Sequence, residues 1–214
     1  MRLLAALLAI LLLGAAEPTA TGPSFSCAGR LSASETAICD DPELSAWDRA
    51  IAVQYPRQLK DKAITRAKQR TWLDQRNACA ADRACIRRAF GDWPGYPGSG
   101  RPGTSFSRPA KYDTGSLTIE PVGGSWYAFS IQAIHIVFDG RGKMLTANDG
   151  NADGVVLVRN GRGHFSSDPG DEFSCEVDFT RRRTGWAIAD NGQCGGLNVV
   201  LDGDYAPDLK PTRN

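Results

Sequence analysis

Six cysteines constrain this chain more than any other feature. They are Cys27, Cys39, Cys79, Cys85, Cys175 and Cys194. An even number of cysteines in an exported chain indicates disulfide bonds. Structural zinc needs closely spaced pairs that bring four ligands together, and these spacings do not supply them. We therefore expect no metal site and three disulfides.

The long gap between Cys85 and Cys175 divides the cysteines into four and two. This predicts the pair Cys175–Cys194. For the first four we favour two local loops, Cys27–Cys39 and Cys79–Cys85. The alternative is Cys39–Cys79 with Cys27–Cys85, because two antiparallel helices would bring those ends together.

The N-terminus is typical of a cleaved export signal. Met1 and Arg2 form a short basic start, and residues 3–16 are apolar and uncharged. A membrane-spanning helix needs about 20 such residues, so we interpret residues 1–16 as a signal peptide rather than an anchor. The mature chain would be periplasmic or secreted, with no stable membrane insertion.

Composition excludes several classes of protein. The 214 residues include 25 Lys and Arg and 24 Asp and Glu, so the net charge of +1 gives no overall attraction to nucleic acid. A mean hydropathy of −0.31 argues against multiple membrane spans. Hydrophobic residues make up 42% of the chain, which argues against disorder. We expect a small soluble protein that binds a partner.

The region 24–90 has helical patterns. Ser32 with Glu35 matches a capping box, and Asp41–Pro42 is a second helix start. Pro56 should end or kink that second helix. A third helix is expected from about residue 61 to residue 78, and Asp82 would cap a final turn. The sum is a small helical hairpin domain linked by disulfides.

Residues 91–110 contain nine Gly or Pro and no period, which predicts a linker. Beyond it, period-2 segments alternate with Gly-, Asn- and Asp-rich turns. The expected strands are 116–120, 134–138, 155–158, 173–179, 186–188 and 197–201. The fold class is therefore α+β, with an antiparallel all-β barrel or sandwich over residues 111–205.

Candidate catalytic groups are few. His135 lies in a strand pattern and His164 follows a turn, and neither is near a Ser-centred catalytic motif. Glu176 and Asp178 share one strand face, so they fit the spacing of a carboxylate pair, but any acidic edge strand does the same. We expect no catalytic residue and no cofactor, so the chain is not predicted to be an enzyme.

The string from Asp149 to Gly154, DGNADG, matches the opening of a calcium-binding loop. The twelfth position of such a loop should be Glu, and here it is Asn160. A polar hairpin turn explains the same residues, and we favour that interpretation over a calcium site.

The N-terminal motifs also resemble a known family. SFSC at 24–27, SETAICDDPELSAWD at 34–48 and QRTWLDQRNAC at 69–79, followed by Cys85–Ile86, are similar to the LprI-type lysozyme-inhibitor N-terminal domain. Three positions depart from the family pattern: Trp47 replaces Leu, Phe90 replaces Tyr, and Pro56 follows the helix tyrosine. The resemblance covers residues 24–90.

The resemblance implies an exported bacterial helical domain that binds and inhibits a lysozyme-like protein without catalysis. The alternative is a periplasmic binding or structural module with another protein or glycan as its partner. An inhibitor needs only a rigid surface that fills the lysozyme cleft, and disulfides supply such rigidity.

Overall fold

Side chains at the helix starts set where the first helices begin. The computed structural model describes residues 22–98, 105–109 and 113–208. At α1 (Ala33–Cys39), Ser32 Oγ accepts from the backbone N–H of Glu35, and the Glu35 carboxylate accepts from the Ser32 N–H at 2.8 Å. Asp41 caps α2 (Pro42–Lys60), and Asp82 caps α4 (Arg83–Gly91). These three predicted helix starts are confirmed.

The structure excludes one of the two effects expected of Pro56 and corrects the start of the third helix. α2 continues through Pro56 to Lys60. Pro56 and Ala52, whose carbonyl loses its helical partner, both lie on the exposed side of the helix, where water can replace that hydrogen bond. α3 (Arg66–Ala78) begins after Thr65, whose side chain accepts from the N–H of Lys68. The hydroxyl of Thr65, and not the carboxylate of Asp61, caps this helix.

The four helices form the helical module (residues 22–98), which packs around aromatic side chains. Trp47 stacks on Phe90 with ring centroids 6.0 Å apart, and Trp72 contacts Phe90 at 5.8 Å. The disulfides Cys27–Cys39 and Cys79–Cys85 are the local pairs that the spacing favoured.

The predicted linker begins as part of this module. Trp93 is buried and donates to Gln69 Oε1 at 2.8 Å, and the Gln58 amide donates to the Tyr96 carbonyl. Residues 99–104 lie outside the described part of the chain. Ser105–Arg108 form the first strand of the sheet.

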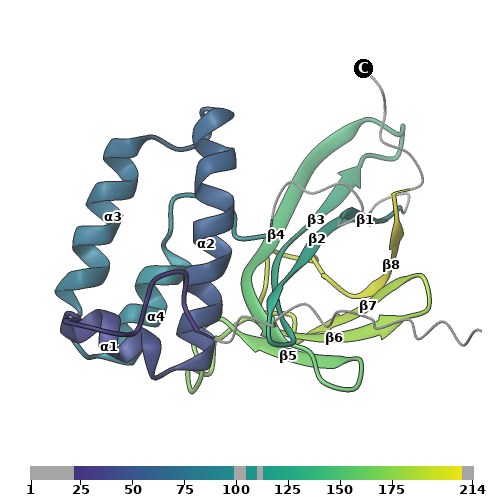
Figure 1. Cartoon of the computed structure of the whole chain (residues 1–214). Coiled ribbons are helices and arrows are strands. Elements are labelled where there is room, and N and C mark those ends of the chain that lie inside the picture. Colours follow the sequence, from purple (N-terminus) through teal and green to yellow (C-terminus); the bar gives the residue numbers. More distant parts are fainter. Residues whose placement is uncertain (1–21, 99–104, 110–112, 209–214) are drawn as a thin grey trace, which may run out of the picture.

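Eight antiparallel strands form one sheet in the order β4-β3-β2-β1-β8-β7-β6-β5, which curls into a nearly closed barrel (Figure 1). We call this the β-domain. Its hydrophobic core lies inside the barrel, around Phe129, Phe179 and Tyr205. The strands are β1 (Ser105–Arg108), β2 (Asp113–Gly123), β3 (Trp126–Phe138), β4 (Met144–Leu157), β5 (Arg162–Ser166), β6 (Glu176–Arg182), β7 (Gly185–Asp190) and β8 (Gly203–Pro207).

The α+β class and the antiparallel barrel are confirmed, but not every strand is. Residues 197–201 were expected to be a strand and are irregular. Asn198 has φ +64°, which breaks an extended backbone. β1, β5 and β8 were not expected, because each of these strands has only four or five residues.

The string DGNADG is a strand and not a turn. It lies inside β4, with Gly150 and Gly154 facing the barrel interior. A Cβ on Gly154 would lie 2.5 Å from the Phe165 ring, and one on Gly150 would lie 2.7 Å from Gly195 Cα. The glycines therefore allow close approach where β4 meets β5 and the loop after β7.

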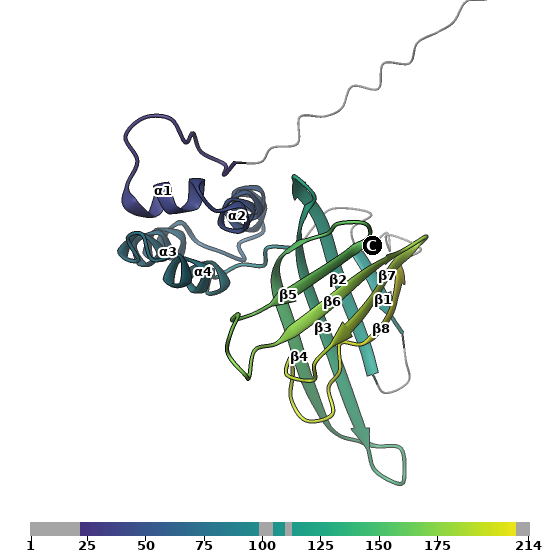
Figure 2. The same cartoon turned by 90° about the horizontal axis from the view of Figure 1, so that it is seen from below.

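The helical module packs on the outer face of the sheet (Figures 1 and 2). Ala128 of β3 lies between Glu120 of β2 and Val155 of β4 in the strand register, and all three are buried. Ala128 and Val155 belong to the same apolar cluster as Trp47 and Phe90. The hydrophobic core of the helical module therefore extends onto the outer face of the sheet, separate from the core inside the barrel.

The predicted signal peptide, residues 1–16, lies outside the described residues. In the portion of the chain that the structure describes, no helix combines the length and the apolar character that a membrane crossing needs.

Candidate functional site

Both histidines pair with an aspartate on a neighbouring strand. His135 Nδ1 lies 2.6 Å from Asp113 Oδ1, and His164 Nδ1 lies 2.9 Å from Asp178 Oδ1. The His164 and Asp178 side chains are 57% and 68% exposed, so this pair sits in water. Among the described residues, neither histidine contacts a hydroxyl or thiol side chain. The geometry is that of cross-strand pairs and not of an activated nucleophile.

The calcium-loop motif does not have the geometry of a calcium loop. Asp149, Asn151 and Asp153 alternate along the extended β4, on its outer face, and cannot wrap around one ion. Asn151 instead donates to Asp153 Oδ2 at 3.2 Å. Within residues 22–98, 105–109 and 113–208, no group of three His, Cys, Asp or Glu side chains is placed to hold a metal.

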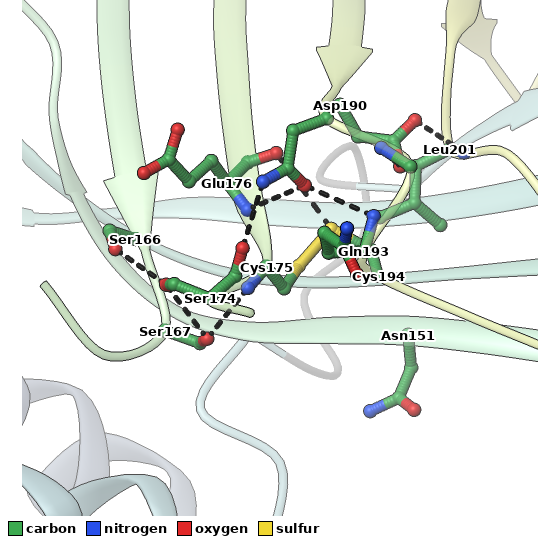
Figure 3. The surroundings of a disulfide bond; sticks show 12 residues. Asn151, Ser166, Ser167, Ser174, Cys175, Glu176, Asp190, Gln193, Cys194 and Leu201 are labelled. Carbon is green, nitrogen blue, oxygen red and sulfur yellow. Dashed lines mark hydrogen bonds between the residues drawn. A yellow bond between two sulfur atoms is a disulfide. The ribbon is translucent and has the colours of Figure 1, made fainter. Parts of the chain in front are cut away.

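The third disulfide, Cys175–Cys194, joins the start of β6 to the loop after β7 (Figure 3). Ser174 Oγ lies 2.7 Å from Ser166 Oγ, and Ser167 Oγ accepts from the Cys175 N–H. The Cys194 carbonyl accepts from the N–H of Asn151 on β4 at 3.0 Å. The disulfide thus fixes a loop that covers part of the free edge of β4.

Two carboxyl groups hold the other end of this loop. The Asp190 N–H donates to Asp202 Oδ1 at 2.6 Å, and Asp190 Oδ1 accepts from the Leu201 N–H at 3.0 Å. Burial raises the pKa of Asp190, and its contact with the Asp202 carboxyl raises it further. This arrangement has a structural role in the loop.

Arg87 of α4 bridges the helical module and the β-domain. Its guanidinium donates to Glu43 Oε1 at 2.7 Å, to the Ser167 carbonyl at 2.6 Å and to the Ser166 carbonyl at 2.5 Å. Arg87 lines a cavity of about 330 Å³ and a second cavity of about 340 Å³. We call the first of these the inter-module cavity.

Two residues that line the inter-module cavity carry buried polar atoms without partners. Trp47 from α2 and Asp153 from β4 both line it. Among the described residues, neither the Trp47 indole N–H nor Asp153 Oδ1 has a hydrogen-bond partner, and both atoms are buried. Burial raises the pKa of the Asp153 carboxyl above its usual value. Buried polar atoms almost always have partners, so two orphans beside one cavity mark it as a candidate binding site.

A second candidate site is the distal end of the β3–β4 hairpin, which extends past the other strands (Figure 2). Within the described residues, which begin again at Asp113, the pairing of β2 with β3 reaches His135, whereas β4 pairs with β3 to Phe138. Phe138, Met144 and Leu145 are 38%, 57% and 64% exposed. The turn between them carries Arg141 and Lys143. We call residues 138–145 the hairpin tip.

Asp139 shapes the hairpin tip. Its Oδ1 accepts from the backbone N–H groups of Arg141 and Lys143, both at 2.8 Å. The carboxylate therefore fixes the turn and leaves both cationic side chains in solvent. Apolar side chains around fixed cations are typical of a protein-binding surface.

Sequence reasoning found the cysteines and missed both of these sites. Trp47 and Asp153 are far apart in the chain, and only the packing of the two modules brings them to one cavity. The sequence does contain one signal for the hairpin tip. Phe138 and Met144 flank the segment DGRGK, and they would be exposed if the hairpin extended past the adjacent strands.

The comparisons with known proteins agree with the resemblance in the N-terminal motifs. A family model described as lysozyme inhibitor LprI matches residues 27–108, which comprise most of the helical module and β1. The resemblance to that family is therefore confirmed for this segment. No curated protein and no solved structure matches the chain.

Proposed function

From the match of residues 27–108 to a lysozyme-inhibitor family, we propose that this protein binds and inhibits a lysozyme-like muramidase and catalyses no reaction itself. That match is the observation that carries the proposal. Three disulfides and the apolar N-terminus favour an extracytoplasmic location. We take the protein to be periplasmic or secreted after removal of residues 1–16.

The hairpin tip is the contact surface that we propose. Of the large apolar side chains that are exposed in the described residues, only Tyr96 lies in the segment that matches the family. Three of the others flank the hairpin turn. Glycosidases of this type place two carboxyl groups in a cleft. Arg141 and Lys143 complement that charge, and a narrow hairpin complements the shape of a cleft.

The experiment follows lysis of cell-wall substrate by a c-type lysozyme with rising amounts of the oxidised, exported chain. We expect dose-dependent inhibition that is lost after reduction and alkylation. No inhibition at a large molar excess would remove the proposal for this class of lysozyme.

A matched pair of double variants locates the surface. R141A/K143A should weaken inhibition at least tenfold, because both cations at the turn are lost. R66A/K68A removes two exposed cations from α3 and should leave inhibition unchanged. The opposite result would place the contact on the helical module.

A further inference from the structure

The inter-module cavity has the size of a small ligand site. Its volume of about 330 Å³ is near the lower end of the range for such sites, roughly 300–1,000 Å³. Residues of both modules line it, including Trp47 and Arg88 from the helices and Asn151 and Asp153 from β4. Ligand sites often form between two packed units in this way.

The unpaired atoms define what a ligand must offer. The described residues contain four buried side-chain nitrogen or oxygen atoms without a partner, and two of the four belong to residues that line this cavity. The Trp47 indole N–H needs an acceptor, and Asp153 Oδ1 needs a donor. Leaving such atoms unpaired costs about 1–3 kcal/mol each. A hydroxyl or amide group can both accept and donate, so groups of this kind can satisfy either atom.

The charges around the cavity favour a neutral ligand. Arg87 and Arg88 lie among its lining residues together with Asp92, Asp153 and Asp168, so neither sign dominates. Arg88 is exposed and makes no ion pair among the described residues, whereas Arg87 is held by Glu43. The rings of Trp47 and Phe165 add apolar surface. Many hydroxyls, no net charge and apolar ring faces are the chemistry of a sugar.

We propose that the inter-module cavity binds one unit of a neutral glycan, with Trp47 Nε1–H donating to a sugar oxygen and Asp153 accepting from a sugar hydroxyl or amide. Both protein atoms are shielded from bulk water. The glycan therefore reaches them only when neighbouring side chains of the cavity lining move. This glycan site goes beyond the proposed inhibition of a muramidase.

The test titrates the oxidised, exported chain with two neutral probes, chitotetraose and cellotetraose, and follows the indole N–H signals by ¹H–¹⁵N NMR. Trp47→Phe identifies the Trp47 signal. We expect a saturable shift of that signal with at least one probe. Binding of chitotetraose alone would show that the acetamido group is recognised.

Variants separate a site from a nonspecific effect. Asp153→Ala should weaken the binding at least tenfold, and Arg88→Ala, at an exposed position, should weaken it less. Asp149→Ala is the matched control, because Asp149 lies on the same face of β4 and does not line the cavity. Retained dispersion of the other indole signals shows that each variant is folded.

The proposal fails if neither tetrasaccharide moves the Trp47 signal at 10 mM. It also fails if Asp153→Ala and Asp149→Ala bind equally well. Neither measurement contains a lysozyme, so failure here leaves the inhibition proposal standing, and failure of inhibition leaves the glycan site standing.

Discussion

The side-chain amide of Gln54 on α2 donates a hydrogen bond to the carboxylate of Glu120 on β2, and both residues are almost completely buried. Arg57 adds an ion pair to the same carboxylate at 3.5 Å. A polar contact thus lies inside the hydrophobic core that joins the two modules. Such contacts are costly when one partner is lost.

The first prediction concerns this contact. Glu120→Ala leaves the buried Gln54 amide without its acceptor and should lower the free energy of unfolding by about 1–3 kcal/mol. Glu120→Gln retains an acceptor oxygen and should lower it less. Guanidinium denaturation followed by far-UV circular dichroism gives both values. Equal losses for the two variants would mean that the hydrogen bond contributes little.

The second prediction concerns the start of α1. Ser32→Ala should destabilise the protein by about 1 kcal/mol, because an N-cap is lost. Hydrogen bonds from the Ser32 backbone and side chain lower the pKa of Glu35 below its ordinary value of 4.5. The stability that this group contributes is therefore present above pH 4.5 and lost as the pH falls through its folded-state pKa.

Glu35→Gln is the matched control for the capping box. Glutamine can serve at this position of the box but does not titrate. The variant should therefore retain the cap and lose the acid-dependent part of its contribution. Thermal denaturation across pH 3–6 tests this, and an unchanged pH profile would rule out the role given to the Glu35 charge.

The third prediction concerns the approach of β4 to β5. Gly154→Ala puts a methyl group 2.5 Å from the Phe165 ring, which is itself packed edge-on against Phe129 at 4.9 Å. Overpacking of this kind costs about 1–3 kcal/mol. The control Gly140→Ala meets no atom within 4 Å and should be nearly neutral. Urea denaturation measures the free energy of unfolding of both variants. If Gly154→Ala leaves it unchanged, Phe165 can move to make room for the methyl group.

The fourth prediction concerns pH and Asp153. Because burial raises its folded-state pKa above the ordinary 3.8, the contribution of Asp153 to stability is complete below pH 3.8 and is lost as the pH rises through the folded-state value. Asp153→Asn does not titrate. Relative to the native chain, it should therefore gain stability between pH 3 and pH 7.

Urea denaturation at both pH values measures that gain. Asp149→Asn, at an exposed position on the same strand, is the control for the loss of a carboxylate that is not buried. Asp153→Asn and the native chain differ in their free energy of unfolding. If that difference is the same at both pH values, burial does not raise the pKa of Asp153.

Local signals in the sequence predicted most of the helical module. Ser32, Asp41 and Asp82 cap helices because their side chains accept from the N–H groups just beyond them, and this needs no information from distant residues. Pro56 does not end α2, because its effect depends on which side of the helix faces water. Asp61 and Thr65 are both able to cap a helix, but Asp61 stands at the C-cap of α2, and Thr65 is the residue that caps α3.

The β-domain was harder to predict because its strands depend on contacts between distant residues. DGNADG has the composition of a turn. Its glycines are needed because Phe165 and Gly195, which lie later in the chain, leave no room for a side chain at Gly154 and Gly150. The inter-module cavity depends on even more distant partners, because Arg87 meets Ser166 across 79 positions. No local pattern encodes such a contact.

Arg49 and Arg87 bind the β-domain in the same manner, at main-chain oxygens. Arg49 donates to the Val122 and Gly123 carbonyls, and Arg87 donates to those of Ser166 and Ser167. Every residue has such an oxygen, so these four contacts do not depend on which side chains the barrel carries. At these four contacts the barrel is therefore free to diverge in sequence during evolution, whereas Glu120, Ala128 and Val155 are constrained by the helix side chains that they meet.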